Sequence, residues 1–403
     1  MSGASSPVDV IVVGAGPSGL VAALRLMDLG LTVLIVDAAT APAQESRAAL
    51  MHAATIEILA EMGMIEELLE RGVRTRAVTL ADGGRRLARV PFDELDSPYP
   101  FALGIPQNET EAILSSRLEQ RGQRVIRGVH VHTIGLIGEA YRVKGTRVHS
   151  DEPWEASAAY VVGADGKNST VREHAGIPYD GASYDEDFIL ADVELAPSPM
   201  PADEARITLS PHGVTVIGLL PSGRHRIVAT APRGRETPRE PDRAYLDDLL
   251  RTRGITTNTR DAPAWSARFR ISHQIARRFR AGNILLCGDA AHVHSPAAGQ
   301  GMNTGIADAF ELARRIAEAR AGDTDALDEY ERVRTHAAEA VVALTDRITR
   351  IALVRTRPAR LFRNTAIRLL TRQPGIRRAL VRSISGIDRS PLPRPIPPMK
   401  DVR

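Results

Sequence analysis

A glycine loop between a strand and a helix, close to the N-terminus, is the strongest constraint on the fold of this 403-residue chain. Residues 8–13, VDVIVV, are mostly β-branched and apolar, which predicts a central parallel strand covered on both faces. GAGPSG follows, an amphipathic helix is expected over about 17–29, and TVLIVD predicts a second strand ending at Asp37. This βαβ order predicts an α/β fold of the Rossmann type.

The spacing of the glycines gives this loop a chemical meaning. Gly14, Gly16 and Gly19 match GxGxxG, which permits a tight turn and brings a pyrophosphate close to the N–H groups at the helix N-terminus. The carboxylate of Asp37 can bind ribose hydroxyls. We therefore expect a dinucleotide site rather than a turn made only for packing; at this point FAD and NAD(P) both remain open.

A second glycine-rich loop lies far along the chain. Residues 284–303 read ILLCGDAAHVHSPAAGQGMN, in which an apolar strand leads to Gly-Asp, two histidines and a glycine turn before a helix. A nicotinamide dehydrogenase needs no such loop, whereas a flavin is long enough to require a second contact. Asp289 can bind ribityl hydroxyls, and backbone N–H groups from Gly301 to Asn303 can face the flavin N1/O2 edge. The second loop favours FAD.

A third motif, GADGKNSTVR at 163–172, lies between GAGPSG at 14–19 and GDAAHVHSPAAGQGMN at 288–303. With these three motifs in this order, the chain resembles the single-component, class A flavoprotein aromatic hydroxylases, such as para-hydroxybenzoate hydroxylase and polyketide hydroxylases. The resemblance spans most of the chain. It implies a Rossmann-like, GR2-type FAD-binding domain, an interleaved antiparallel substrate sheet and C-terminal helices. It also implies FAD and NADPH as cofactors, with NADH possible.

The resemblance also implies roles for individual residues. Arg47 is expected near the FAD phosphates and the mobile flavin, Gln107 against FAD, Asp165 near FAD and NADPH, and Pro296 beside the flavin ring. For His52, packing and an active-site contact both remain open. The expected catalytic residues are Arg47, His52 and Pro296. The expected cofactor contacts are Gly14, Gly16, Pro17, Ser18, Gly19, Asp37, Arg47, Gln107, Asp165, Asp289, Pro296, Gly299, Gly301, Met302 and Asn303.

The chain departs from the family pattern at Ala54, where many relatives carry arginine in HARTLE, so one phosphate- or backbone-facing contact is expected to be missing. His292 and His294 are expected to be structural rather than metal ligands. Longer phenol and polyketide hydroxylases continue into a thioredoxin-like domain, which we expect to be absent here. A monomer and a homodimer both remain open.

Alternating strands over 185–231 predict an antiparallel sheet that lines a substrate pocket. The expected domains are FAD-binding over 1–72, 101–178 and 266–345, substrate-binding over 73–100 and 179–265, and C-terminal helices with a Pro-rich tail over 346–403.

The reaction implied by the resemblance is aromatic hydroxylation. NAD(P)H would reduce FAD, O2 would form a flavin C4a-hydroperoxide, and a phenolic or polyketide-type carbon would take the distal oxygen. A base that activates the phenol is expected, and Tyr184, His212 and His225 are candidates. The alternatives are an FAD-dependent reductase or dehydrogenase of the same fold, and a non-redox FAD-holding partner in a biosynthetic complex.

Composition limits the other partners. The net charge is only +3, and the scarcity of lysine (Lys144, Lys167 and Lys400) fits a GC-rich genome better than nucleic-acid binding. One cysteine, Cys287, cannot form an internal disulfide, which favours the cytoplasm. No Cys/His group has zinc-site spacing, so no metal is expected. No segment reaches the ~18 consecutive apolar residues of a membrane span.

Overall fold

The elements around the N-terminal glycine loop are those that the sequence predicts. The computed structural model describes residues 7–43, 48–232, 234, 236–295 and 299–392. Strand β1 (Val8–Val13), helix α1 (Pro17–Asp28) and strand β2 (Val33–Asp37) form the expected βαβ unit. Val10, Ile11 and Val12 are fully buried, as a central strand covered on both faces requires.

β1 lies inside an eight-stranded sheet. The order is β19–β20–β11–β1–β2–β8, and β9 and β10 extend the sheet from β11 as a hairpin. The neighbours β20, β11, β1 and β2 pair in parallel, so their carboxyl ends lie at one edge. The other members are β8 (Ile126–Arg127), β9 (Val129–Ile137), β10 (Ala140–Arg147), β11 (Pro153–Gly163), β19 (Arg280–Ala281) and β20 (Ile284–Leu286).

A second eight-stranded sheet contains the strands predicted over 185–231. Its order is β21–β18–β12–β16–β15–β14–β5–β6. Most neighbours are antiparallel, as expected, but β5 and β14 pair in parallel because β5 comes from a distant segment rather than through a hairpin. Its members are β5 (Ala77–Asp82), β6 (Arg85–Pro91), β12 (Tyr179–Val193), β14 (Glu204–Ser210), β15 (Gly213–Leu219), β16 (His225–Thr230), β18 (Trp265–Ala276) and β21 (His292–Val293).

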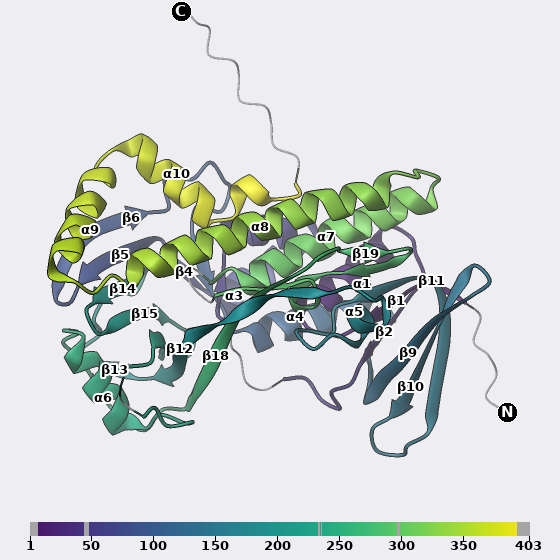
Figure 1. The fold of residues 1–403 in the computed structure, drawn as a ribbon, viewed down its shortest axis with the longest axis horizontal. Helices are drawn as coiled ribbons and strands as arrows, with labels where there is room; N and C mark the ends of the chain where they lie inside the picture. The colour runs from purple at the N-terminus through teal and green to yellow at the C-terminus, as the bar shows by residue number, and fades with distance from the viewer. Residues whose placement is uncertain (1–6, 44–47, 233, 235, 296–298, 393–403) are drawn as a thin grey trace, which may run out of the picture.

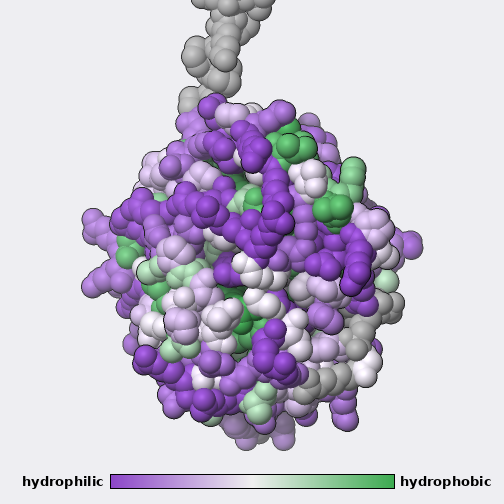
Figure 2. Space-filling model, turned by 90° about the vertical axis from the view of Figure 1, so that its left-hand side faces the viewer, coloured by the Kyte–Doolittle hydropathy of each residue, from purple (hydrophilic) through white to green (hydrophobic). Residues whose placement is uncertain are grey.

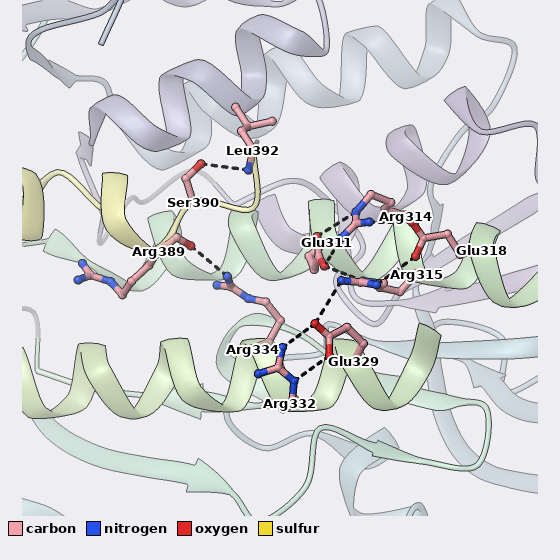
Figure 3. A network of polar contacts seen from close by, with 10 residues as sticks. All are labelled: Glu311, Arg314, Arg315, Glu318, Glu329, Arg332, Arg334, Arg389, Ser390 and Leu392. Carbon is pink, nitrogen blue, oxygen red and sulfur yellow. Dashed lines mark hydrogen bonds and ion pairs between the residues drawn. The ribbon is translucent and has the colours of Figure 1, made fainter. Parts of the chain in front are cut away.

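Two long helices follow the second glycine-rich loop. They are α7 (Gly301–Arg320) and α8 (Ala326–Ala352), which pack together and lie side by side in Figure 1. α7 also packs against α1, so the helices that follow the two glycine loops are direct neighbours. Ion pairs support the packing of α7 on α8: Arg315 binds Glu318 within α7 and lies 3.7 Å from Glu329 of α8 (Figure 3).

The C-terminal helices lie over the edge of the second sheet. They are α9 (Arg357–Leu370) and α10 (Pro374–Ile384), and both contact β6. This end of the molecule is mainly hydrophilic, with scattered apolar side chains between the charged ones (Figure 2). Within the described ranges, no helix combines the length and apolar character that crossing a membrane would need.

Short elements complete the fold around two main cores. One core lies between the first sheet and helices α1, α4 and α7, and the other between the second sheet and α6. The small sheets are β3 (Leu50–Met51) with β7 (Ala102–Gly104) and β4 (Val73–Thr75), and β13 (Leu195–Ala196) with β17 (Asn258–Thr259). The remaining helices are α2 (Ala53–Glu61), α3 (Ile65–Arg71), α4 (Gln107–Gln120), α5 (Thr170–His174), α6 (Arg243–Thr252), η1 (Gly288–Ala290) and η3 (Ile387–Arg389).

Candidate functional site

The three sequence motifs meet at the carboxyl edge of the parallel strands. Val13, Gly163 and Leu286 are paired across β1, β11 and β20, so the residues after them emerge side by side. These residues begin the first loop (14–19), the DG loop (163–172) and the GD loop (288–303). This edge is where open α/β sheets bind their ligands.

Two glycines of the first loop are required by close packing, and one faces open space. A Cβ on Gly14, whose φ is +103°, would lie 2.2 Å from the carbonyl oxygen of Ala164. A Cβ on Gly19 would lie 1.9 Å from the oxygen of Gly14, whereas a Cβ on Gly16 would meet nothing within 4 Å. The loop is therefore tight on its protein side and open beside Gly16.

The N-terminus of α1 is suited to negative charge. Gly16 is its N-cap and offers no capping side chain, and the first turn contains no acidic residue. The N–H groups of this turn therefore keep their capacity to bind an anion. Asp37 ends β2 beside the loop, where its carboxylate accepts hydrogen bonds from the N–H groups of Ala15 (2.6 Å) and Ala39 (2.7 Å). This loop-shaping role adds to the ribose contact expected from the sequence.

The GD loop packs directly against the first loop. A Cβ on Gly288 would lie 2.6 Å from Oγ of Ser18, and a Cβ on Gly305 would lie 2.4 Å from the same oxygen. The Cα of Gly288 would lie only 3.0 Å from that Gly305 Cβ. The absence of side chains at both glycines lets α7 approach α1 closely, which brings the two glycine loops together.

The DG loop is held by its own aspartate. Asp165 accepts hydrogen bonds from Oγ of Ser169 (2.5 Å) and from the N–H of Val171 (3.1 Å), so it shapes the turn into α5. Burial raises the pKa of the Asp165 carboxyl, although these hydrogen bonds act in the opposite direction.

A second set of contacts joins the DG loop to the GD loop. Arg172 donates a hydrogen bond to the carbonyl oxygen of Ala290 (3.0 Å), and its guanidinium lies 4.0 Å from the centre of the Tyr179 ring. Tyr179 in turn donates to the carbonyl oxygen of Asp289 (2.9 Å). Burial, with the nearby Asp289 carboxylate, raises the pKa of the Tyr179 hydroxyl, which therefore remains a donor. Asp289 itself is exposed.

Asn303 connects the start of α7 to the segment that contains His52. Its side chain donates to the carbonyl oxygens of Leu50 (2.9 Å) and Gly299 (2.7 Å) and accepts from the N–H of His52 (2.7 Å). His52 is 2% exposed and lies at the N-cap of α2. The structure therefore brings His52, Gly299 and Asn303 together, although they are far apart in the sequence.

Four other residues expected at the cofactor remain to be placed: Gln107, Met302, Arg47 and Pro296. Gln107 begins α4, donates its N–H to the carbonyl oxygen of Ala48 (2.9 Å) and binds Glu111 through its side chain (2.8 Å). Met302 is buried in the core of the first sheet. Arg47 and Pro296 lie outside the described residues.

The two histidines of the GD loop differ in their partners. His292 lies 2.5 Å through Nε2 from a carboxylate oxygen of Asp308, and that carboxylate also binds the N–H of Gly288 (3.2 Å) and Nε of Arg334 (2.7 Å). Burial raises the pKa of Asp308, but the Arg334 and His292 charges and hydrogen bonds outweigh it, and the net shift is downward. His292 therefore has the structural role expected for it.

His294 supplies a buried acceptor beside the start of α7. Its Nδ1 lies 3.1 Å from the carbonyl oxygen of Ser295, so Nδ1 carries the proton and Nε2 is an acceptor. That Nε2 is buried and lacks a partner among the described residues, and a Cβ on Gly301 would lie 4.0 Å from the neighbouring Cε1. Burial and the neighbouring His292 lower the pKa of His294 to about 4, so the ring is neutral near pH 7.

These features fit a flavin dinucleotide. The open side of Gly16 and the uncapped start of α1 suit a pyrophosphate. The exposed Asp289 and the acceptor on His294 suit the hydroxyl and N–H groups of a ribityl chain and a ring. Gly16 and Asp289 lie beyond the carboxyl ends of β1 and β20 in the first sheet, and His294 follows β21 of the second sheet, close to the start of α7.

The candidate bases lie elsewhere. His225 is opposite Val193 at the end of β12 remote from Tyr179, which corresponds to roughly 40 Å of strand. It is buried beside Ser198, and burial lowers its pKa. His212 is exposed on the turn between β14 and β15. Nothing described places either histidine at the loop junction, and the side chain of Tyr184 lies outside the described residues.

Several residues at the junction escaped sequence reasoning. Asp308, Arg334 and Arg389 sit on helical segments with no motif of their own, and only the fold brings them to the GD loop. Gln300 stands inside the motif GQGMN, which was the one signal available for it.

Comparisons with known proteins identify the family of the chain. The model of a family described as FAD binding domain matches residues 7–345. An uncharacterized aromatic compound monooxygenase of Bacillus subtilis is 31% identical over 401 residues, which cover 97% of this chain and 78% of that protein. The 6-methylpretetramide 4-monooxygenase of Streptomyces rimosus is 33% identical over 361 residues, which cover 86% of this chain but only 64% of that relative.

Solved structures agree in fold. The crystal structure of p-nitrophenol 4-monooxygenase from Pseudomonas putida superposes with a TM-score of 0.84 at 22% identity, covering 94% of this chain and 98% of that one. The similarity therefore extends through both sheets and the helices between them. With the family match and the monooxygenase relatives, it shows that this chain belongs to the FAD binding domain family.

Proposed function

We propose that this protein is an FAD-dependent monooxygenase that uses O2 and NAD(P)H to hydroxylate an aromatic compound of phenolic or polyketide type. The observation that carries the proposal is the junction of the three loops at one sheet edge. That junction has room for both halves of one FAD, and two relatives of this chain are named as monooxygenases. A dehydrogenase that binds only a nicotinamide dinucleotide would need no second binding loop such as the GD loop.

Different residues of the junction would contact different parts of the cofactor. Gly14, Gly16, Pro17, Ser18 and Gly19 would hold the pyrophosphate and Asp37 the adenosine ribose. Asp165 and Asp289 would face the flavin half, with Arg47, Gln107 and Pro296 completing the contacts. Gly299, Gly301, Met302 and Asn303 would form the wall against the ring. FAD, when bound, supplies the two-electron chemistry that activates O2.

The protein itself would orient the cofactor, stabilise negative charge on it and exclude water from the site. α7 is 20 residues long, and its first turn contains no acidic residue, so its N-terminus can stabilise negative charge beside Gly301. His52 and Asn303 are nearly inaccessible to solvent, which supports a site from which water is excluded. We expect the sheet built from 73–100 and 179–265 to form the wall on the substrate side and the segments 1–72, 101–178 and 266–345 to hold FAD, ahead of C-terminal helices over 346–403.

The reductant and the compartment belong to the same proposal. We expect NADPH, with NADH as the alternative. A cytoplasmic location is proposed because the single cysteine is fully buried and no disulfide can form within the chain.

The test is oxygen incorporation. The full chain is loaded with FAD and supplied with phenols and polyketide-type aromatics, and the consumption of NADPH and of NADH is compared. Mass spectrometry under isotopically labelled O2 then reads the product. We expect one aromatic compound to stimulate consumption and to gain one labelled oxygen atom. Reduction of a substrate without oxygen gain would instead indicate a reductase, and a protein that cannot be loaded with FAD would contradict the proposal.

A further inference from the structure

The chain after α10 folds back onto the segment that contains His52. We call residues 383–389, the last two residues of α10 and the five that follow, the C-terminal hook. Gly386 adopts φ +75°, which reverses the chain, and Ile387 is buried with Ala53 and Ala54. The N–H of Ala54 donates to the carbonyl oxygen of Ser385 (3.2 Å), and a Cβ on Gly386 would lie 3.4 Å from the Cβ of Ala54. The small side chain at position 54, noted above as a departure, leaves room for the hook.

The hook determines the orientation of a buried amide. Nε2 of Gln300 donates to the carbonyl oxygen of Ile384 (2.8 Å), and Oε1 accepts from the guanidinium of Arg389 (3.4 Å). A carbonyl oxygen only accepts and a guanidinium only donates, so both contacts require the same orientation of the amide. Gln300 is 2% exposed, and therefore water has little access to offer it other partners.

That amide faces the ring of His52. Nε2 of Gln300 lies 3.3 Å from Nε2 of His52. Because the amide nitrogen can only donate, the ring Nε2 must accept, and the proton of the neutral ring must be on Nδ1. His52 also donates its backbone N–H to Asn303 at the start of α7. The hook therefore acts, through Gln300, on a residue at the flavin end of the site.

A second connection anchors the hook to the GD loop. Arg334 of α8 donates to the carbonyl oxygen of Arg389 (3.2 Å), and Figure 3 shows the two side by side. The same guanidinium binds Asp308 (2.7 Å), whose carboxylate holds the N–H of Gly288. Arg389 also donates to the carbonyl oxygen of Ser383 (2.7 Å) within the hook. The position of Arg389 is thus set from two sides.

We propose that the C-terminal hook sets the tautomer of His52 through Gln300, which makes Gln300 and Arg389 positioning residues of the flavin site. His52 then presents its only ring N–H at Nδ1, and its Nε2 is held as an acceptor. The consequence for catalysis rests on the proposed function, whereas the tautomer itself does not. The hook lies about 80 residues beyond the GD loop, so the chain must extend through α9 and α10 to complete this contact.

The tautomer can be read directly by NMR. The full chain is labelled with 15N-histidine, its ring nitrogens are observed through long-range proton–nitrogen correlations, and His52→Asn assigns the signals of His52. We expect Nε2 at its unprotonated position and Nδ1 at its protonated one. Gln300→Glu replaces the donor facing the ring with an acceptor, so Nε2 should move to the protonated position. Arg389→Gln should give a mixture of the two tautomers, and Arg389→Lys should restore the wild-type signals.

A matched control lies on the same segment. Arg382 directs its guanidinium to the partly exposed carboxylate of Asp388, so Arg382→Gln removes an ion pair of this segment other than the Arg389–Gln300 contact and should leave the His52 signals unchanged. A wild-type spectrum with protonated Nε2 would overturn the proposal, as would His52 signals that remain unchanged in both Gln300→Glu and Arg389→Gln. Far-UV circular dichroism shows whether each variant is folded, and Gln300→Glu still tests the proposal if Arg389→Gln unfolds.

The two proposals fail separately. Loss of the tautomer effect with intact hydroxylation would refute the role of the hook alone. A chain that shows the expected His52 tautomer but, once loaded with FAD, transfers no oxygen to any aromatic compound would refute the proposed function alone.

Discussion

Asp308 and His294 are both buried, but their surroundings compensate the loss of hydration to different extents. Asp308 is completely buried, but Arg334 and His292 compensate its charge, and its pKa is lowered despite the opposing effect of burial. For His294, the raising effects of the Ser295 carbonyl and of Asp308 are too small to compensate, and burial together with His292 lowers its pKa to about 4. His294 is therefore stable only as a neutral ring, and this makes it sensitive to acid.

Acidification should destabilise the protein through His294. Its folded-state pKa of about 4 lies below the value of 6.5 for an unburied histidine, so the unfolded state takes up a proton first as the pH falls. Between about pH 7.5 and about pH 5, this difference removes about 2 kcal/mol from the free energy of unfolding. Urea unfolding of wild type and His294→Gln at both values measures it, and the variant should lose about 2 kcal/mol less.

The exposed His132 provides the control, because His132→Gln should lose as much stability on acidification as wild type does. Equal losses in wild type and His294→Gln would show that the ring of His294 is not kept neutral by burial.

At the scale of elements, the site depends on how closely α7 approaches α1. Both helices begin just after a glycine loop, and their separation is set where Ser18, Gly288 and Gly305 meet. Interiors are packed so densely that an added methyl group forces neighbours to move. The glycine in the first turns of α7 is therefore a packing requirement, although glycine lowers the intrinsic stability of a helix.

Gly305→Ala should destabilise the protein by about 1–3 kcal/mol, because the new Cβ would meet Ser18 and the Cα of Gly288. Thermal or urea unfolding measures the loss. Adding Ser18→Ala removes one of the two obstacles, so the double variant should recover part of the stability. Gly375 in α10 is the helical control, since a Cβ there meets nothing within 4 Å and Gly375→Ala should be neutral or stabilising. A neutral Gly305→Ala would mean that α7 can move away from α1 without cost.

At the scale of the whole molecule, one ligand would join segments that lie far apart in the chain. The first loop and the GD loop belong to the same sheet edge, so FAD can bind only when both parts of the chain are folded. A ligand that binds the folded state alone stabilises it in proportion to its saturation. FAD should therefore raise the unfolding temperature of the complete chain.

FAD at about 100 times its dissociation constant should add about 2.7 kcal/mol to the free energy of unfolding of wild type. Asp289→Ala should bind FAD weakly and show little of this gain relative to its own stability without FAD. Differential scanning fluorimetry with and without FAD makes the comparison. Asp261, also exposed, is the control, and Asp261→Ala should keep the full gain. A full gain in Asp289→Ala would contradict the assignment of the GD loop to FAD.

Local patterns were sufficient for the elements and for the positions of the loops. The apolar run at 8–13, the glycines at 14–19 and the strand before Gly288 correspond to β1, the first loop and β20 in the structure. The α/β fold class and the membership in the FAD binding domain family are confirmed, and the relatives include proteins named as aromatic and polyketide monooxygenases. These features were readable because periodicity and turn chemistry act over a few neighbouring residues.

Local sequence patterns did not predict the contacts between segments that are far apart in the chain. The parallel pairing of β5 with β14, the compensation of Asp308 by Arg334, and the contact of Arg389 with Gln300 each join residues that no local pattern relates. The assignments of His52, Asp289 and the other cofactor contacts remain predictions. The sequence alone therefore specified where the cofactor loops are, because their glycines serve local geometry. Only the tertiary structure specified which side chains hydrogen-bond to these loops and which charges lie beside them. Those side chains belong to helices from other parts of the chain, and helix packing places them next to the loops.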